Sequence, residues 1–129
     1  MSEPKRLLVE AVVAVHRILV ADHGGLPRVR DASSLSSALS RPRQLAAYGD
    51  GRTIPELAAA YCYGLARSHP FVGGNKHIAL NATGILLGLN GYVLSATEAD
   101  AVFVMEGLAA DEIEESELAA WFSENARAM

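Results

Sequence analysis

Apolar residues recur with helical spacing along most of the chain, and the first set lies near the N-terminus. Its members, three or four residues apart, are Leu8, Val12, Val15 and Leu19. Such spacing places apolar side chains on one face of a helix. Gly24 and Gly25, followed by Pro27, continue a helix poorly and predict where this first helix ends.

A second, shorter helix is predicted from Asp31, a favourable N-cap residue. Its apolar positions are Leu35, Ala38 and Leu39. A residue that precedes proline disfavours helical backbone, so we expect this helix to stop near Arg41 and Pro42. The stretch 41–52 ends in turn-forming residues, and we predict a long exposed loop there with at most a short extended piece.

Two further helices begin at predicted caps. Thr53-Ile-Pro-Glu56 is a capping box with an early proline, and the helix that it opens is predicted to run to about Ser68. Thr97, with Asp100 three residues later, caps another helix. The last predicted helix starts at about Ser116, and its apolar positions are Leu118, Trp121 and Phe122.

The helix predicted over about 75–90, ended by Gly91, is apolar on nearly every face. Its apolar residues are Ile78, Ala79, Ala82, Ile85, Leu86, Leu87 and Leu89. A helix with this pattern is typical of the buried centre of a bundle. Gly84 and Gly88, four residues apart, predict that a neighbouring helix approaches it closely.

These elements indicate an all-α fold, a bundle of about six helices in a single domain spanning residues 1–129. The chain has 129 residues, 50% of them hydrophobic and 20% charged, which favours a compact globular protein over a disordered one. A net charge of −4 gives no overall basic field, so we expect no direct nucleic-acid binding. Cys62, the single cysteine, is predicted to be a core residue.

The N-terminal apolar run is interrupted by Glu10, His16 and Arg17. It therefore resembles neither a signal peptide nor a membrane span, and a cytoplasmic location without membrane contact is the expectation.

The loop "SHPFVGGNKHIALN", residues 68–81, connects two long apolar helical segments. The first N–H groups of a helix lack backbone partners, and the helix dipole adds positive charge there. Gly73 and Gly74 place no side chains in the way, and Lys76 adds a full charge, so the loop is suited to a phosphate. His69, at the other end, can take a proton from a hydroxyl group.

From spacing alone, a plain connection between helices and an anion site both stay open for this loop. A Walker-type phosphate loop is excluded because GxxxxGK[ST] is absent. His69 and His77 have no third ligand clustered with them in the sequence, so no metal site is predicted.

The stretch "HPFVGGNKHIALN" resembles the signature loop of the Fic/Doc superfamily, H-P-F-x-[D/E]-G-N-[G/K]-R. It is most similar to the Doc (death-on-curing) branch, which also has a lysine at the position of Lys76 and an apolar-Asn pair like Leu80-Asn81. The segments "HGGLPRVRDASSLSSALSRP", "YCYGLARSHPF" and "LNGYVL" are similar to Doc proteins as well. The resemblance therefore extends from about Leu7 to Phe122.

Doc toxins transfer phosphate from ATP to a threonine of elongation factor Tu and halt translation, whereas Fic relatives transfer AMP. By this resemblance, His69 is the general base. The residues expected to contact the ATP phosphates are Gly74, Asn75, Lys76 and Asn81, and Phe71 is expected to be buried. His16 also matches a histidine of Doc proteins, and it is either a wall of the site or a core histidine.

Two positions of the motif loop, 69–77, depart from the family pattern. Gly73 replaces the acidic residue that holds Mg²⁺ in the family, and glycine has no oxygen ligand to offer. His77 replaces an arginine, whose planar charge a neutral imidazole cannot reproduce. Either the protein is a Doc-type enzyme with strongly impaired activity, or it is a catalytically silent module that binds an antitoxin or a nucleotide.

The resemblance also implies a partner protein. Doc toxins are paired with a Phd-type antitoxin whose C-terminal segment folds onto the toxin and covers the site. The inhibitory pattern [ST]-x-x-x-E-[GN] of some Fic proteins is absent from this sequence. Inhibition is therefore expected to come from another chain.

Overall fold

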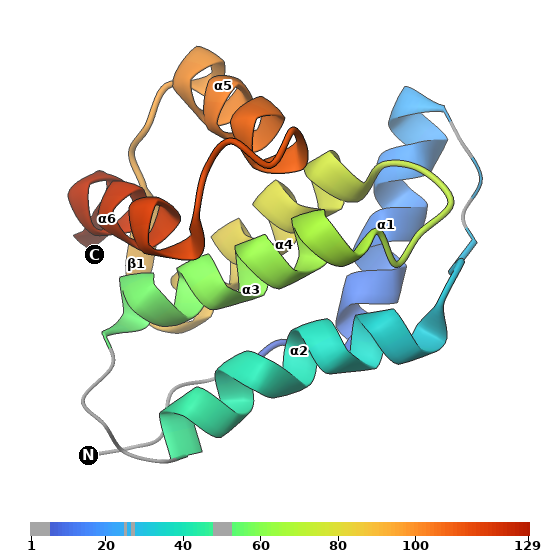
Figure 1. Ribbon diagram of the computed structural model, residues 1–129, viewed down its shortest axis with the longest axis horizontal. Coiled ribbons are helices and arrows are strands. Elements are labelled where there is room, and N and C mark those ends of the chain that lie inside the picture. The colour runs from blue at the N-terminus through green and yellow to red at the C-terminus, as the bar shows by residue number, and fades with distance from the viewer. Residues whose placement is uncertain (1–5, 25, 27, 48–52) are drawn as a thin grey trace.

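The computed structural model describes residues 6–24, 26, 28–47 and 53–129 (Figure 1). These residues form six helices and a two-stranded sheet, so the all-α prediction is confirmed. The helices are α1 (Val9–His23), α2 (Ala32–Ala47), α3 (Ile54–Ser68), α4 (Asn75–Leu89), α5 (Glu98–Ala109) and α6 (Glu115–Asn125). The strands are β1 (Tyr92–Leu94) and β2 (Ala126–Ala128).

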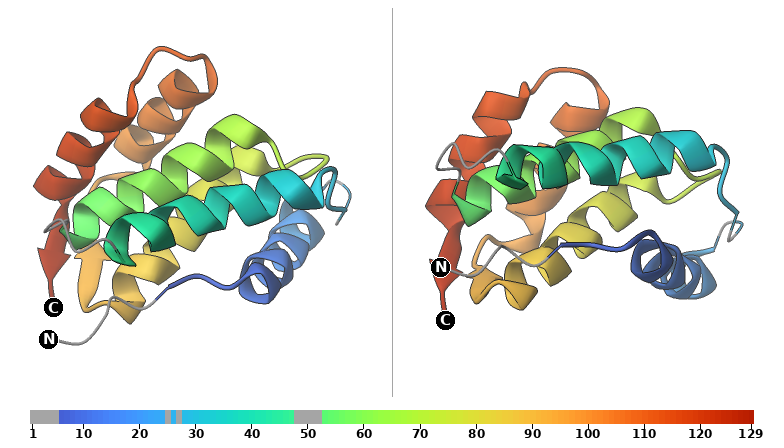
Figure 2. Two further views of the ribbon diagram at one scale, coloured as in Figure 1. Left: turned by 60° about the horizontal axis from the view of Figure 1, so that its bottom comes forward. Right: turned by 90° about the horizontal axis from the view of Figure 1, so that it is seen from below.

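Helix α3 lies at the centre and packs against α2, α4, α5 and α6, while α1 and α6 lie at opposite ends of the molecule (Figure 2). Its capping box is confirmed, because the Thr53 side chain accepts from the Glu56 N–H and the Glu56 carboxylate accepts from the Thr53 N–H. The buried positions of this helix are Pro55, Leu57, Ala58, Ala59, Ala60, Tyr61, Cys62, Leu65 and Ala66. Their small average size lets four neighbours pack around one helix.

Helix α4 packs against α1, α3, α5 and β1 and buries six residues, among them Ile78 and Leu87. Ile85 and Leu89, on its outer side, are 42% and 46% exposed. The predicted close approach at Gly84 and Gly88 is wrong, because a Cβ atom at either position would meet nothing within 4 Å. Both glycines lie on a side of α4 against which no helix of the described chain packs tightly.

The close approach occurs instead between α2 and α3. A Cβ atom at Gly64 would lie 3.3 Å from the Cβ atom of Ala38. Gly64 therefore allows the two helices to pack with their backbones near each other, a contact that the spacing of residues in the sequence did not indicate.

The predicted end of the second helix is wrong, since α2 continues through Pro42 to Ala47. A proline inside a helix costs roughly 3 kcal/mol. Pro42 is itself buried, and burial of an apolar side chain offsets part of that cost. The remainder of the predicted loop, residues 48–52, lies outside the described residues.

The other predicted starts agree with the structure. Asp31 caps α2, with its Oδ1 accepting from the Ser34 N–H at 3.1 Å, and Thr97 caps α5. Helix α6 begins one residue before the predicted Ser116. The sheet was not predicted, because strands of three residues are too short to show an alternating pattern of apolar and polar residues. In it, β1 pairs antiparallel with β2, and Tyr92 lies opposite Ala128.

The core prediction for Cys62 is confirmed. Its side chain is fully buried, and burial raises the pKa of the thiol to about 12. Within the described residues, no helix has the length and apolar character that crossing a bilayer requires.

Candidate functional site

The loop between α3 and α4 begins at His69, whose backbone is left-handed with φ 47° and ψ 56°. This conformation is uncommon for a residue other than glycine and occurs where the surrounding structure enforces a turn. Arg30 supplies that enforcement, because its Nε and Nη2 donate to the His69 carbonyl at 2.9 and 2.6 Å and its Nη2 donates to the Ser68 carbonyl at 3.2 Å. The His69 residue is exposed, so its imidazole is accessible.

The segment before α2 pairs with this loop over several residues. The Arg30 N–H donates to the Pro70 carbonyl at 2.7 Å, and the Val72 N–H donates to the Arg28 carbonyl at 3.1 Å. The pairing places Phe71 inside, with 1% of its surface exposed. The predicted burial of Phe71 is therefore confirmed, and the loop is attached to a second part of the chain.

Asn75 fixes the same loop from its other side. Its Nδ2 donates to the Phe71 carbonyl at 3.0 Å, and its Oδ1 accepts from the Phe71 N–H at 3.0 Å. Both ends of the amide are thus used within the loop. A phosphate at this position would meet the backbone N–H of Asn75 before its side chain.

His16 of α1 contacts the loop from the interior of the protein and is 1% exposed. Its Nε2 lies 2.7 Å from the Gly73 carbonyl oxygen, and its ring stacks on Phe71 with centroids 3.7 Å apart and planes at 14°. His16 is therefore a core histidine, as one of the two alternatives predicted, and its contact with Gly73 also supports the loop backbone.

The loop ends at Gly74, the N-cap residue of α4, with φ 74° and ψ 19°. A Cβ atom there would lie 3.5 Å from His16 Nε2, whereas a Cβ atom at Gly73 would meet nothing within 4 Å. The first turn of α4 carries no acidic residue. Its N–H groups and the helix dipole therefore offer a positive end without a neighbouring carboxylate.

Lys76 extends toward α5, where its Nζ pairs with Glu106 Oε1 at 2.9 Å. Lys76 and His77 line a cavity of about 220 Å³ between α4 and α5, together with Leu80, Val102, Met105 and Glu106. Asn81 donates from its Nδ2 to the His77 carbonyl at 2.9 Å, so in this conformation its amide bonds to its own helix.

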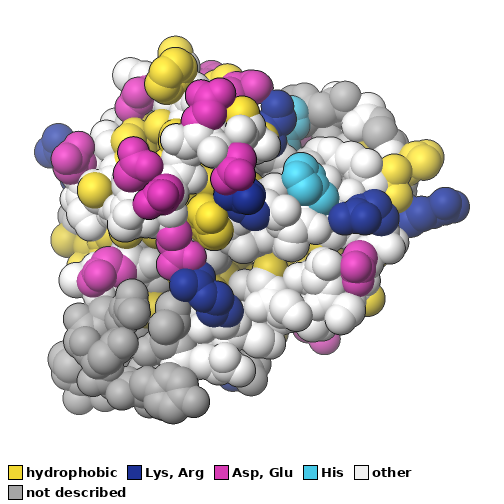
Figure 3. Space-filling view, in the orientation of Figure 1, with side chains coloured by type: hydrophobic (Ala, Val, Ile, Leu, Met, Phe, Trp, Pro, Cys, Tyr) yellow, Lys and Arg dark blue, Asp and Glu magenta, His cyan; other side chains and the backbone are white. Residues whose placement is uncertain are grey.

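The structure thus places His69, Gly73 and Gly74 in the loop. It places Asn75 and Lys76 in the first turn of α4 and Asn81 farther along the same helix. In the space-filling view, Lys and Arg side chains lie on both sides of a surface histidine on this face (Figure 3). Arg30 and Glu106 also contact this region, and neither was predicted to have a role in it. Neither residue carried a signal, because each contacts the loop region from a distant part of the chain.

The residues present do not fit a bound Mg²⁺ ion. Magnesium prefers carboxylate oxygen ligands in octahedral geometry, and Gly73 has none to give. Among the described residues, no three His, Cys, Asp or Glu side chains are grouped closely enough to hold a metal ion. An anionic phosphate group, in contrast, fits the chemistry of the α4 N-terminus.

A family model described as the Fic/DOC family matches residues 6–87, which include the whole loop. The chain belongs to the Fic/DOC family. It is 32% identical over 82 residues to the "Protein kinase doc" of Escherichia phage P1, a stretch that is 64% of this chain and 65% of the relative. It is 42% identical over 76 residues to the "Toxin Doc" of Mycolicibacterium smegmatis, 57% of each chain. The chain thus spans less than two thirds of the length of these relatives.

Proposed function

We propose that this protein is a Doc-like toxin of a toxin–antitoxin module, derived from an ATP-dependent protein phosphotransferase that acts on a hydroxyl of elongation factor Tu. The observation that carries the proposal is the loop itself. It presents an accessible His69 at one end and the N-terminus of α4 at the other, and both are held by Arg30, Asn75 and His16. The names of the two relatives, a kinase and a toxin, support the same function.

In the proposed reaction, ATP supplies the γ-phosphoryl group when it is bound. His69 accepts the proton of the acceptor hydroxyl, and the hydroxyl oxygen forms the new bond to the γ-phosphorus. The bond from that phosphorus to the β–γ bridging oxygen breaks, and ADP leaves. The N–H groups of Gly74, Asn75 and Lys76 bind phosphate oxygens at the α4 N-terminus. Asn81 adds a polar contact after its side chain turns away from the His77 carbonyl.

Activity is expected to be strongly impaired. Loss of one electrostatic donor to a transition state typically costs about 10²–10³ in rate. Gly73 removes the carboxylate that would place a cation, and His77 removes a permanent charge. The cytoplasm, where elongation factor Tu and ATP are found, is the proposed location.

A catalytically silent binding module for an antitoxin or a nucleotide is the second candidate. It is favoured by the ion pair of Lys76 with Glu106, which directs the Lys76 ammonium group away from the loop. It is also favoured by the glycine at position 73. Transfer of AMP instead of phosphate is a further variant of the enzyme, since the same loop would bind the same nucleotide.

We also propose that a Phd-like antitoxin covers the loop with its C-terminal segment. Three apolar residues near the loop and the α4–α5 cavity are exposed, Val72 at 45%, Val102 at 48% and Phe103 at 75%. An amphipathic helix could bury these side chains while it blocks His69.

The double variant Gly73→Asp, His77→Arg tests the enzyme. The space beside Gly73 and the exposure of His77 accommodate both new side chains. We expect the double variant to arrest growth without its antitoxin and to transfer labelled γ-phosphate to elongation factor Tu, with each single variant near background. Adding His69→Ala should abolish both effects. If the folded double variant neither slows growth nor labels a protein in a cell extract, the proposed phosphotransferase activity is refuted. The proposal of a catalytically silent binding module then takes its place.

A further inference from the structure

Helix α1 carries apolar residues on its outer face as well as on the side that packs into the core. The outer face consists of Ala11, Ala14, Ile18 and Ala21, all of them exposed, and Ile18 is 62% exposed. Figure 2 shows α1 at the edge of the molecule. The three- and four-residue spacing of this face is the spacing by which one helix packs against another. Ile18 is the one large side chain on it and projects from a surface of alanines.

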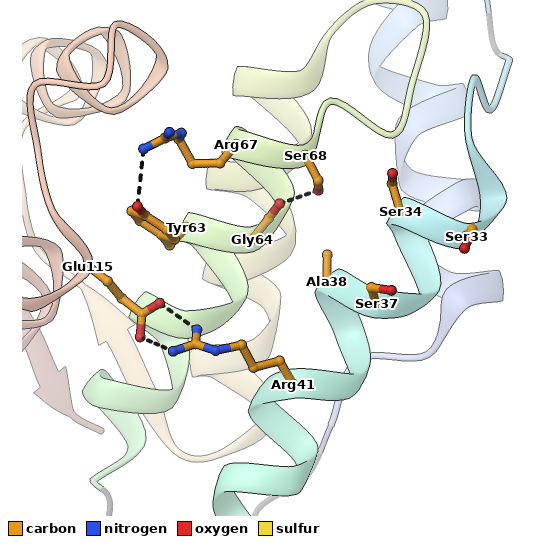
Figure 4. A pocket seen from close by; sticks show the side chains of 10 residues that line it. All are labelled: Ser33, Ser34, Ser37, Ala38, Arg41, Tyr63, Gly64, Arg67, Ser68 and Glu115. Atoms are coloured by element: carbon orange, nitrogen blue, oxygen red, sulfur yellow. Dashed lines mark hydrogen bonds and ion pairs between the residues drawn. The ribbon is translucent and has the colours of Figure 1, made fainter.

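Two charged residues flank the outer face, and neither is neutralised within the described part of the chain. Glu10 and Arg17 lie two helical turns apart on the same flank, and both are exposed. Neither forms an ion pair with another described residue. The groove of about 580 Å³ between α2 and α3 differs in this respect, because Arg41 there is paired with Glu115 (Figure 4). Glu10 and Arg17 therefore remain for a partner molecule.

A hollow of about 300 Å³ opens at the N-terminal end of α1. Leu8, Val9 and Glu10 line it on one side, and Leu39 and Ser40 of α2 line it on the other. The projecting Ile18 lies in the opposite half of the same helix. A helix with a projecting apolar side chain in one half and a partly apolar hollow at the other end is complementary to a second copy of itself in reverse orientation.

An antiparallel pairing of two α1 helices satisfies the charges and the hollow in one register. In an antiparallel pair the same flank of both helices meets, so Glu10 of each copy can face Arg17 of the other. In that register Ile18 faces Val9 of the second copy, and Val9 lines the hollow. Ala14 lies next to the two-fold axis, where its small side chain lets the two helices approach closely. The two-fold axis repeats each of these contacts.

We propose that the outer face of α1 is a docking surface for a second copy of this chain, and that two copies form a weak antiparallel homodimer through it. The helix has 15 residues. Its face is therefore about 22 Å long, and covering it buries less than the roughly 800 Å² per partner of a standard interface. We expect a dissociation constant in the micromolar range or above. His16, which supports the loop, lies on the buried side of α1, so this dimer does not depend on the proposed phosphotransfer.

The first test is sedimentation equilibrium of the full chain at concentrations from about 10 μM to about 1 mM, which cover a weak interface. Ile18→Asp places a charge at the centre of the contact with the hollow. Val93→Asp is the matched control, because Val93 is an exposed valine on β1, away from α1. We expect Ile18→Asp to raise the dissociation constant about tenfold or more, as loss of a central contact does, and Val93→Asp to leave it unchanged.

The second test exchanges the two charges. Glu10→Arg and Arg17→Glu each place like charges opposite each other in the dimer, so each should raise the dissociation constant several-fold. The double variant with both changes restores opposite charges and should regain the affinity of the unmodified chain. An equimolar mixture of the two single variants should also associate, because one copy then carries two arginines and the other two glutamates. Added salt should weaken the dimer of the unmodified chain.

Two results would overturn the docking surface: an unmodified chain that stays monomeric over the whole concentration range, or equal effects of Ile18→Asp and Val93→Asp. Thermal unfolding of every variant checks that it is folded. If neither the folded double variant nor the mixture of single variants associates more tightly than the single variants alone, the antiparallel pairing is refuted, and the proposal with it. None of these results bears on the proposed phosphotransfer, which the labelling of elongation factor Tu tests separately.

Discussion

His16 Nε2 lies 2.7 Å from the carbonyl oxygen of Gly73, and this contact joins α1 to the loop across 57 positions of sequence. A carbonyl oxygen only accepts, so Nε2 is the donor in this bond. The bond fixes the peptide that precedes the N-cap of α4. The backbone geometry of the loop, where we propose that a phosphate binds, therefore depends on a residue of the first helix.

Replacing His16 with phenylalanine should keep the stacking on Phe71 and remove the donor to Gly73. We expect a loss of about 1–2 kcal/mol in the free energy of unfolding, because the carbonyl is left without this partner in a part-buried place. Urea unfolding measures the loss, and hydrogen exchange should become faster at residues 71–75. Unchanged exchange in the loop would show that His16 does not hold it.

The two adjacent glycines of the loop should respond differently to alanine. Gly74→Ala forces a side chain into a left-handed backbone with φ 74°, at a cost of about 1–2 kcal/mol. Gly73→Ala has open space and no such backbone constraint, so it should change stability by no more than about 0.5 kcal/mol. Thermal unfolding of both variants tests this, and similar melting temperatures would contradict it.

Nucleotide binding should survive without magnesium. The N–H groups at the start of α4 are backbone groups and persist whatever side chain stands at position 73. We expect calorimetry to detect weak binding of ATP or phosphate that Mg²⁺ changes little, because Gly73 offers no carboxylate for the cation. Tight binding that requires magnesium would refute this expectation.

Glu106→Gln should strengthen that binding. The substitution releases Lys76 from its ion pair with Glu106. An exposed pair is worth up to about 1 kcal/mol, so the affinity should rise by at most about fivefold. Lys76→Met is the control and should weaken binding, and the effect of Glu106→Gln should vanish in the Lys76→Met background. A gain that persists without Lys76 would assign the effect to another residue.

Co-expression with a Phd-like antitoxin should give a stable complex. We expect calorimetry to show a negative heat-capacity change, since folding of the antitoxin segment on the toxin buries apolar surface. Phe103→Glu should weaken the complex by placing a charge on the exposed apolar surface, whereas Val93→Glu, on β1, should not. If the unmodified chain does not bind the Phd-like antitoxin, the proposal that such an antitoxin covers the loop is contradicted.

Stability should fall at high pH because of Cys62. The folded-state pKa of its thiol is raised to about 12 by burial, above the value of about 8.5 expected for an unfolded chain. The unfolded state therefore loses its proton first, and stability decreases as pH rises between those values, by up to about 1.4 kcal/mol per pH unit. Denaturant unfolding at pH 8 and pH 10 should show a larger difference for the unmodified chain than for Cys62→Ala. Equal differences would contradict the prediction.

Local chemistry in the sequence determined where most helices begin and end. Thr53 with Glu56, Asp31 and Thr97 mark helix starts because a side-chain oxygen next to free backbone N–H groups acts within one turn. Gly24 and Gly91 mark ends because their positive φ angles suit glycine. The order of residues in the loop likewise indicated the family, which is confirmed, while the phosphate site stays a prediction.

Contacts between distant segments were decided only by the tertiary structure. Helix α2 passes through Pro42, where the local penalty predicts a stop, and Pro42 is buried in the folded chain. Gly64, and not Gly84 or Gly88, allows close helix packing because its neighbour there is Ala38. The support of Gly73 by His16, the capping of His69 by Arg30 and the pairing of Lys76 with Glu106 each join residues at least 30 positions apart. Such pairs depend on how the helices are arranged in space, and spacing along the chain carries no record of that arrangement.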